Sequence, residues 1–165
     1  MTNASQPGDE LTIHRLRSAL LVAFLLGLFG TGAELLLVEH TENFWQQLPL
    51  ALMAISLAVL GWSFITRRRM GMRIFQATTI LFAMSGFAGL FLHYQANVEF
   101  ELEMYPQMKG WELFWKANKG TAPPAMAPGA MILLGLLGLA YSYRHPILTQ
   151  RAGEKSPNDE KNGRD

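Results

Sequence analysis

The sequence predicts an all-α integral membrane protein: a four-transmembrane-helix antiparallel bundle with both chain ends in the cytoplasm and a long periplasmic loop between the third and fourth helices. Half of the 165 residues are hydrophobic and only 16% are charged, well below the roughly 25% of soluble domains. Four apolar stretches have lengths close to the roughly 20 residues that a helix needs to cross a bilayer. The distribution of arginine and lysine supplies the orientation.

The four predicted spans cover about residues 16–38, 48–66, 73–93 and 127–143. The first has a longer apolar run than the roughly 7–15 residues of a signal-peptide core, so we expect it to be retained. The last is the shortest, and three prolines precede or open it, which suits a helix start. Together they predict one transmembrane domain over residues 14–146, between a polar cytoplasmic N-terminus (1–13) and a disordered cytoplasmic tail (147–165).

Basic residues cluster on one side of these spans. One group lies before the first span or between the second and third, and the other follows the last span: Arg15, Arg17, Arg67, Arg68, Arg69, Arg73, and Arg144, Arg151, Lys155, Lys161, Arg164. The opposite side has only Lys109, Lys116 and Lys119. The positive-inside rule therefore places the arginine-rich side in the cytoplasm. Short connections between the spans favour a bacterial inner membrane, with the other face periplasmic.

The connections are of two kinds. Short turns should make the first three helices antiparallel neighbours, whereas the loop over residues 94–126 is too long for a simple connector. Trp111, Phe114 and Trp115 lie at helical spacing in this loop, which predicts a short amphipathic helix. Trp45, Trp111 and Trp115 are predicted to be membrane-interface anchors. Apolar residues alternate with acidic ones over residues 98–103, and this period of two predicts an extended segment.

Glu34 is the most informative residue inside a predicted span. Gly27, Gly30 and Glu34 share one helix face, so we expect the carboxyl group to point into the bundle, near the periplasmic boundary. His93 ends the third span at a similar height, and the two side chains would meet. An ionisable group in a span suggests function, although a hydrated or purely structural Glu34–His93 contact is the plainer interpretation.

A metal or proton site would draw on neighbouring groups. His40 follows the first span, and Glu99 and Glu101 belong to the acidic segment after the third. The candidate ligands are therefore Glu34, His40, His93, Glu99 and Glu101, a set that suits a divalent metal or a proton-responsive site. For the acidic residues, a solvated face is the competing interpretation.

Haem is disfavoured by the spacing of the histidines. His14 and His40 are 26 residues apart, or roughly 39 Å along a helix, which would place paired haems at or outside the hydrocarbon boundary. A single haem between His40 and His93 is the alternative that this spacing leaves, and otherwise we expect no cofactor beyond the metal ion considered above. His145 precedes a proline and marks a helix end.

The other patterns indicate packing. Ala51, Ala54, Ala58 and Gly61 form a small-residue track on the second span, and Gly135 with Gly138 forms a close-approach surface on the fourth. The sequence has no Gly-rich phosphate loop and no basic–aromatic patch that would indicate nucleic-acid binding.

Two functions follow from these features. The first is a non-enzymatic accessory or assembly subunit, bound to a membrane-protein partner or to further copies of itself within the lipid bilayer. The alternative is a protein that binds or transports a metal ion or protons through the periplasm-facing Glu/His site. An enzyme that acts on lipid or quinone at the periplasmic surface ranks third.

Overall fold

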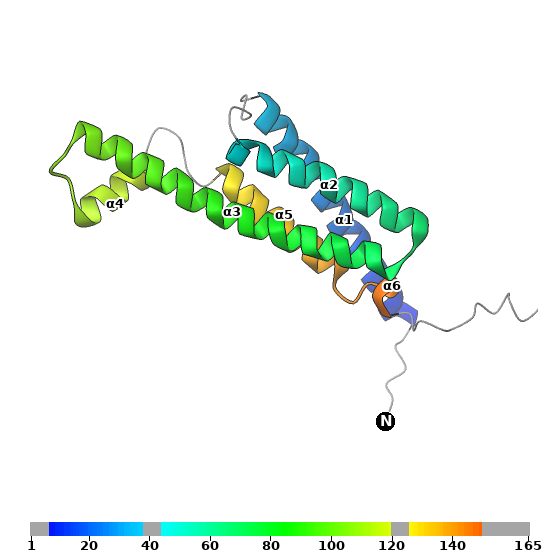
Figure 1. Ribbon diagram of the computed structural model, residues 1–165. Coiled ribbons are helices and arrows are strands. Elements are labelled where there is room, and N and C mark those ends of the chain that lie inside the picture. Colours follow the sequence, from blue (N-terminus) through cyan, green and yellow to red (C-terminus); the bar gives the residue numbers. More distant parts are fainter. Residues whose placement is uncertain (1–6, 38–43, 120–125, 150–165) are drawn as a thin grey trace, which may run out of the picture.

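The computed structural model describes residues 7–37, 44–119 and 126–149, and every regular element within these ranges is helical. The elements are α1 (Pro7–Leu37), α2 (Phe44–Thr66), α3 (Arg69–Met104), α4 (Gly110–Asn118), α5 (Met126–Ser142) and α6 (Pro146–Thr149). Figure 1 shows α3 as the longest helix, with α2 and α5 lying along it and α4 folded back at its far end.

Three of these helices, α1, α2 and α3, are long and apolar enough to cross a membrane, and α5 is a shorter apolar helix of 17 residues. Each of these four helices overlaps one of the predicted spans over nearly its whole length. Less than a third of the most apolar window of each long helix is buried inside the protein. Exposed apolar side chains surround the helices, as expected for a surface that faces lipid.

The core lies where α1, α3 and α5 meet. Phe24 of α1 is fully buried and makes edge-to-face contacts with Phe75 and Phe82 of α3, at ring-centroid distances of 5.5 and 6.3 Å. Tyr141 of α5 packs edge-on against Phe75 at 6.0 Å. Such perpendicular pairs are the favoured geometry of aromatic rings, and they fix three helices around one side chain of α1.

Small residues let α5 approach α3 closely, as the sequence predicts for Gly135 and Gly138. A Cβ added at Gly135 would lie 2.7 Å from the Thr79 carbonyl oxygen and 2.8 Å from the Ala83 amide nitrogen. At Gly138 an added Cβ would collide with the Thr79 side chain. Only glycine fits where two helix backbones come this near.

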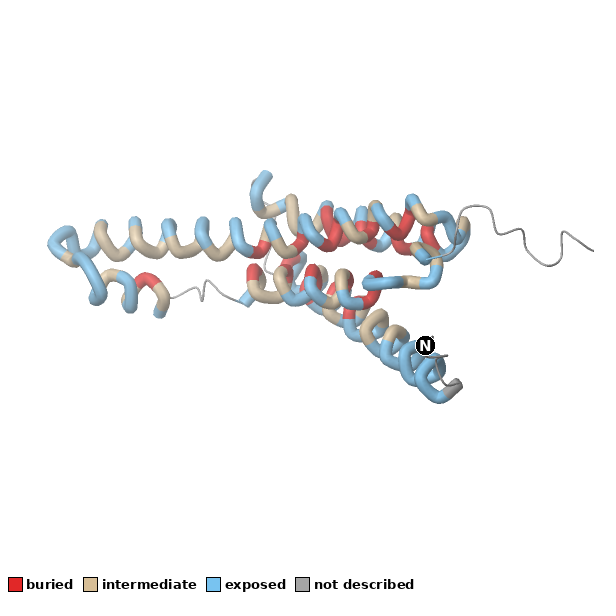
Figure 2. Tube along the Cα trace, turned by 90° about the horizontal axis from the view of Figure 1, so that it is seen from below, coloured by how far each residue is buried: buried red, intermediate tan, exposed pale blue. Residues whose placement is uncertain are grey.

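Two packing predictions are wrong. The small-residue track of α2 is exposed, because α2 faces α3 with a different set of residues: Leu52, Met53, Ser56, Leu60 and Ser63. The helices α1 and α2 make only sparse contacts, since α1 packs mainly on α5. Figure 2 shows α1 diverging from the other helices, with its N-terminal half exposed.

The segment after the third span is helical, which corrects two further predictions. Residues 98–103 belong to α3, which continues without a break to Met104, so the segment is not extended. The predicted long loop therefore consists largely of the end of α3 and of α4, and the short amphipathic helix at Trp111 is confirmed as α4. We call residues 93–118, the end of α3 with α4, the distal hairpin.

At the opposite end, Arg17 joins α1 to the end of α5. Its Nη2 donates hydrogen bonds to the carbonyl oxygens of Tyr143 and Arg144, at 3.2 and 3.0 Å. These carbonyls lie where α5 ends, and a cation is favourable at a helix C-terminus. The turn that follows carries the half-buried His145, whose Nδ1 accepts a hydrogen bond from the Ile147 backbone N–H at 3.3 Å.

Candidate functional site

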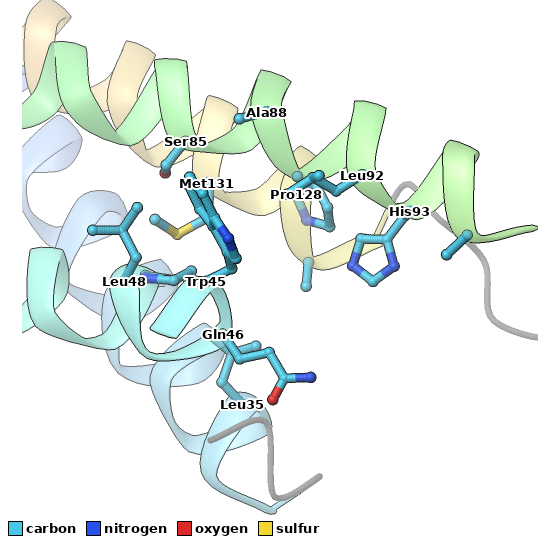
Figure 3. Close-up of a pocket in the computed structure, with 14 residues that line it drawn as sticks. Leu35, Trp45, Gln46, Leu48, Ser85, Ala88, Leu92, His93, Pro128 and Met131 are labelled. Carbon is cyan, nitrogen blue, oxygen red and sulfur yellow. The ribbon is translucent and has the colours of Figure 1, made fainter. Parts of the chain in front are cut away.

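A cavity of about 350 Å³ opens where α1 ends and where α2 and α5 begin, beside the middle of α3. Its fourteen lining residues come from all four apolar helices and are shown in Figure 3. They are Leu35, Trp45, Gln46, Leu48, Pro49, Ser85, Ala88, Gly89, Leu92, His93, Ala96, Ala127, Pro128 and Met131. Ligand sites in proteins typically have this size and a mostly apolar wall.

The walls follow from how α5 and α2 begin. The first turn of α5 is pressed against α3, because an added Cβ at Gly86 would lie 2.6 Å from the Pro128 carbonyl oxygen. This contact places Pro128 and Met131 at the floor. The first turns of α2 face them with Trp45 and Leu48. Pro49, the sixth residue of α2, lacks the N–H that would otherwise bond the Trp45 carbonyl oxygen.

Polar groups occupy two places in the cavity. Gln46 and His93 lie at one side, and Ser85, Leu48 and Met131 lie at the other, as Figure 3 shows. The Ser85 hydroxyl donates to the Phe82 carbonyl oxygen at 2.9 Å, which leaves its oxygen lone pairs as acceptors. No Asp, Glu, Lys or Arg is among the lining residues. Among the described lining residues, His93 is therefore the one whose side chain can become charged at moderate pH.

The structure does not unite the predicted Glu34–His93 pair. Glu34 is exposed on α1 and is not among the residues that line the cavity, whereas its neighbour Leu35 is buried and does line it. The expectation that Glu34 points into the bundle is therefore wrong for this chain. Gly30, on the same face, is also exposed and has no atom within 4 Å of an added Cβ.

The other predicted ligands lie along the distal hairpin or outside the described residues. Glu99 and Glu101 follow His93 by six and eight residues on α3, or roughly 9 and 12 Å along the axis, too far to share one ion. Glu101 instead forms an ion pair with Lys116 of α4, with Nζ and Oε2 3.9 Å apart. His40 lies outside the described residues. Within those residues, no three His, Cys, Asp or Glu side chains gather, so the metal site stays a prediction that depends on His40.

The distal hairpin is a second surface of interest. Three contacts hold α4 against α3: the Asn97 Nδ2 donates to the Ala117 carbonyl oxygen at 2.9 Å, the Glu101–Lys116 ion pair lies beside it, and the Tyr94 and Phe114 rings are 6.0 Å apart. The helix α4 also exposes an aromatic cluster, in which Trp111, Phe114 and Trp115 are 69%, 39% and 49% exposed. The Trp111 and Phe114 rings stack with centroids 5.0 Å apart.

Comparison with known proteins adds no assignment. No family model, no curated protein and no solved structure matches the chain. The site therefore has to be interpreted from its own chemistry.

Sequence reasoning missed most of the cavity. Trp45 was expected to act only as an interface anchor, and Gln46 and Met131 carried no signal, because they belong to the first turns of helices far apart in the chain. His93 was the one lining residue that the sequence identified as a candidate ligand. A period of 3.6 residues identifies faces of one helix, but it does not say which faces of different helices meet.

Proposed function

We propose that the protein is a four-span bacterial inner-membrane protein that works as a non-enzymatic accessory or assembly subunit of a larger membrane complex. The observation that supports this most directly is the distal hairpin, which extends past the ends of the other helices (Figure 1) and exposes aromatic side chains. Aromatic residues are enriched at the centres of protein interfaces.

The height of the hairpin favours a protein partner over a lipid anchor. With Arg73 and His93 at the two hydrocarbon boundaries, Asn97 lies roughly 6 Å above the second boundary. Because α4 runs back along α3 with Ala117 beside Asn97, Trp111 lies roughly 9 Å higher still. The head-group layer is only about 5–8 Å thick on each side. In an upright α3, the aromatic cluster therefore stands above the lipid head groups.

The membrane-level surface supports the same proposal. Small residues on spanning helices usually mark helix–helix contacts, yet the track of Ala51, Ala54, Ala58 and Gly61 is exposed. Glu34 is also exposed on α1, where a carboxyl group near lipid is costly without a partner. A neighbouring helix would cover either surface.

The alternative, metal or proton binding through Glu34 and His93, has less support. The two residues face different surroundings, one on the open face of α1 and one in the cavity. The arginine-rich end, with Arg17, Arg67 and Arg144, remains the basis for placing both chain ends in the cytoplasm.

Site-specific photo-crosslinking in the native membrane tests the proposal. A benzophenone side chain at Phe114 replaces an exposed residue of the aromatic cluster, and the same group at Phe64 replaces an exposed residue on the apolar face of α2. We expect a discrete protein adduct from position 114 that disappears in Trp111→Ala/Trp115→Ala, whereas position 64 yields lipid adducts or none.

The same purified sample separates the two functions. Metal analysis and an absorption spectrum are recorded after mild-detergent purification. A stoichiometric metal that is lost in His93→Ala, together with no adduct from position 114, would replace the accessory-subunit proposal with the metal-site alternative.

A further inference from the structure

The cavity beside α3 has a polar end and a mostly apolar end, which includes Ser85. The lining residues of α3 run from Ser85 to Ala96, eleven residues apart on the same helix, so the cavity extends roughly 16 Å along α3. Gln46 and His93 lie at the end nearer the distal hairpin, and the other end is walled by Leu48, Met131 and small residues of α3 (Figure 3). Its long direction follows a spanning helix, as a lipid chain does.

The charge of the cavity restricts its ligand. Among its described lining residues there is no arginine or lysine, so a phosphate group would be buried without a fixed cation, which is unfavourable. Gln46 and His93 each have both donor and acceptor capacity, and the Trp45 indole adds an N–H donor and a flat apolar face. These groups suit carbonyl or hydroxyl oxygens on an uncharged head group.

We propose that the cavity binds one membrane-soluble molecule with an apolar chain and an uncharged, hydrogen-bonding head group, the chemistry shared by quinones, isoprenols and diacylglycerols. The chain lies toward Leu48 and Met131, and the head group lies between Gln46 and His93. The ligand enters from the bilayer, because the lining helices are the apolar ones.

Fluorescence quenching of Trp45 tests this binding directly. One variant keeps only Trp45, with Trp62, Trp111 and Trp115 changed to Phe. A second keeps only Trp62, which is also exposed on α2 but lies outside the cavity. Decylubiquinone, a short-chain quinone that quenches indole fluorescence, is titrated into each protein in detergent. We expect saturable quenching at one equivalent for Trp45 and only linear, collisional quenching for Trp62.

A filled cavity provides the matched control. Ala88→Phe adds a ring to a lining residue, and Ala77→Phe adds the same ring three turns earlier on the same face of α3, outside the cavity. Ala88→Phe should weaken the saturable phase at least tenfold, and Ala77→Phe should leave it unchanged. Circular dichroism checks the fold, and Ala96→Phe, at the polar end, replaces Ala88→Phe if that variant does not fold.

Competition separates the head groups. Dioleoylglycerol should displace the quinone from the Trp45-only protein, whereas dioleoylphosphatidylglycerol, with the same chains and an anionic head, should not. Linear quenching of Trp45, or a saturable phase that survives Ala88→Phe (or Ala96→Phe in its place), would overturn the cavity as the site. Equal displacement by the two lipids would overturn the selection for an uncharged head.

Discussion

The helix α3 packs against two short helices in opposite ways. Against α5 it uses glycines and fully buried side chains such as Thr79 and Phe82, so the two backbones are nearly in contact. Against α4 it uses a hydrogen bond, an ion pair and partly exposed rings. All residues of α3 that are buried lie in its first half, between Gly71 and Gly86. We call the α3–α5 contact the first seam and the α3–α4 contact the second. The first seam therefore holds the fold together, and the second positions the aromatic cluster and opens more easily.

The largest expected effect comes from Gly135→Ala in the α3–α5 seam. The added methyl group would meet backbone atoms of Thr79 and Ala83, which have no rotamer by which to move away. Overpacking costs about 1–3 kcal/mol, which should lower the thermal midpoint in detergent by roughly 2–12 °C at about 2–4 °C per kcal/mol.

Gly61→Ala is the matched control, because it makes the same change in the interior of α2. An added Cβ at Gly61 has no atom within 4 Å, and alanine is the better helix former by about 1 kcal/mol. We expect an unchanged or higher midpoint. Equal losses in the two variants would mean that the α3–α5 seam is no tighter than the open face of α2.

Asn97→Ala should open the α3–α4 seam without affecting the first one. The change removes the side-chain donor to the Ala117 carbonyl oxygen. Ala117 is completely buried, and an unsatisfied buried acceptor costs about 1–3 kcal/mol. Amide exchange of α4 should therefore accelerate about tenfold, since each 1.4 kcal/mol of local opening free energy is a factor of about ten.

Two readouts make this prediction specific. Exchange in α5 should not change, and Gln95→Ala, an exposed amide two residues away on α3, should leave α4 protected. If α4 and α5 accelerated together in Asn97→Ala, the two seams would form a single cooperative unit and the comparison would fail.

The same contrast explains how far the sequence could predict this fold. The positions of the apolar helices and the glycines of α5 were predictable, because length, hydropathy and small-residue spacing are properties of one segment. The role of α2 was not, because its track of small residues and its Leu52–Ser63 face are both plausible contact surfaces. Only the shape of α3 selects between them.

The predictions for the acidic segment and for Glu34 were wrong for related reasons. In residues 98–103 the alternation that predicts a strand also fits a helix, since Glu99 and Glu103 are four residues apart and Glu101 falls on the opposite side, toward Lys116. Glu34 was expected to follow Gly27 inward, but Leu35 takes the buried position. One helical step of 100° separates the lining of the cavity from the exposed face.

A pH effect is expected at the foot of α5. Burial, and then the positive charge of Arg17, lower the pKa of His145 below its usual 6.5, and its Nδ1 accepts a backbone hydrogen bond that protonation would remove. The unfolded chain therefore binds the proton more tightly than the folded one. Stability from this group is complete above about pH 6.5, falls as the pH drops toward the folded pKa, and is constant below it.

Thermal midpoints at pH 7.5 and 5.0 measure this effect. The wild-type protein should lose stability at the lower pH, and His145→Gln should reduce that loss, whereas His14→Gln, an exposed histidine at the start of α1, should not. A pH dependence that is unchanged in His145→Gln would show that the end of α5 does not sense the proton.

The smallest expected effect is that of Glu101→Gln in the α3–α4 seam. The ion pair with Lys116 is long at 3.9 Å, and the Lys116 side chain is 43% exposed, so its contribution should be about 0.2–1 kcal/mol. Lys116 also keeps its position over the Tyr105 ring, at 3.9 Å from the centroid. Exchange of α4 should therefore rise by no more than about fivefold, and the difference from wild type should shrink at 1 M salt, where charges are screened within about 3 Å.

Glu103→Gln, on the exposed side of α3, should have no effect on α4. A loss in Glu101→Gln as large as that in Asn97→Ala, and abolished at 1 M salt, would mean that charge rather than the Asn97 hydrogen bond holds the hairpin closed. The aromatic cluster would then be positioned by a contact that ionic strength can release.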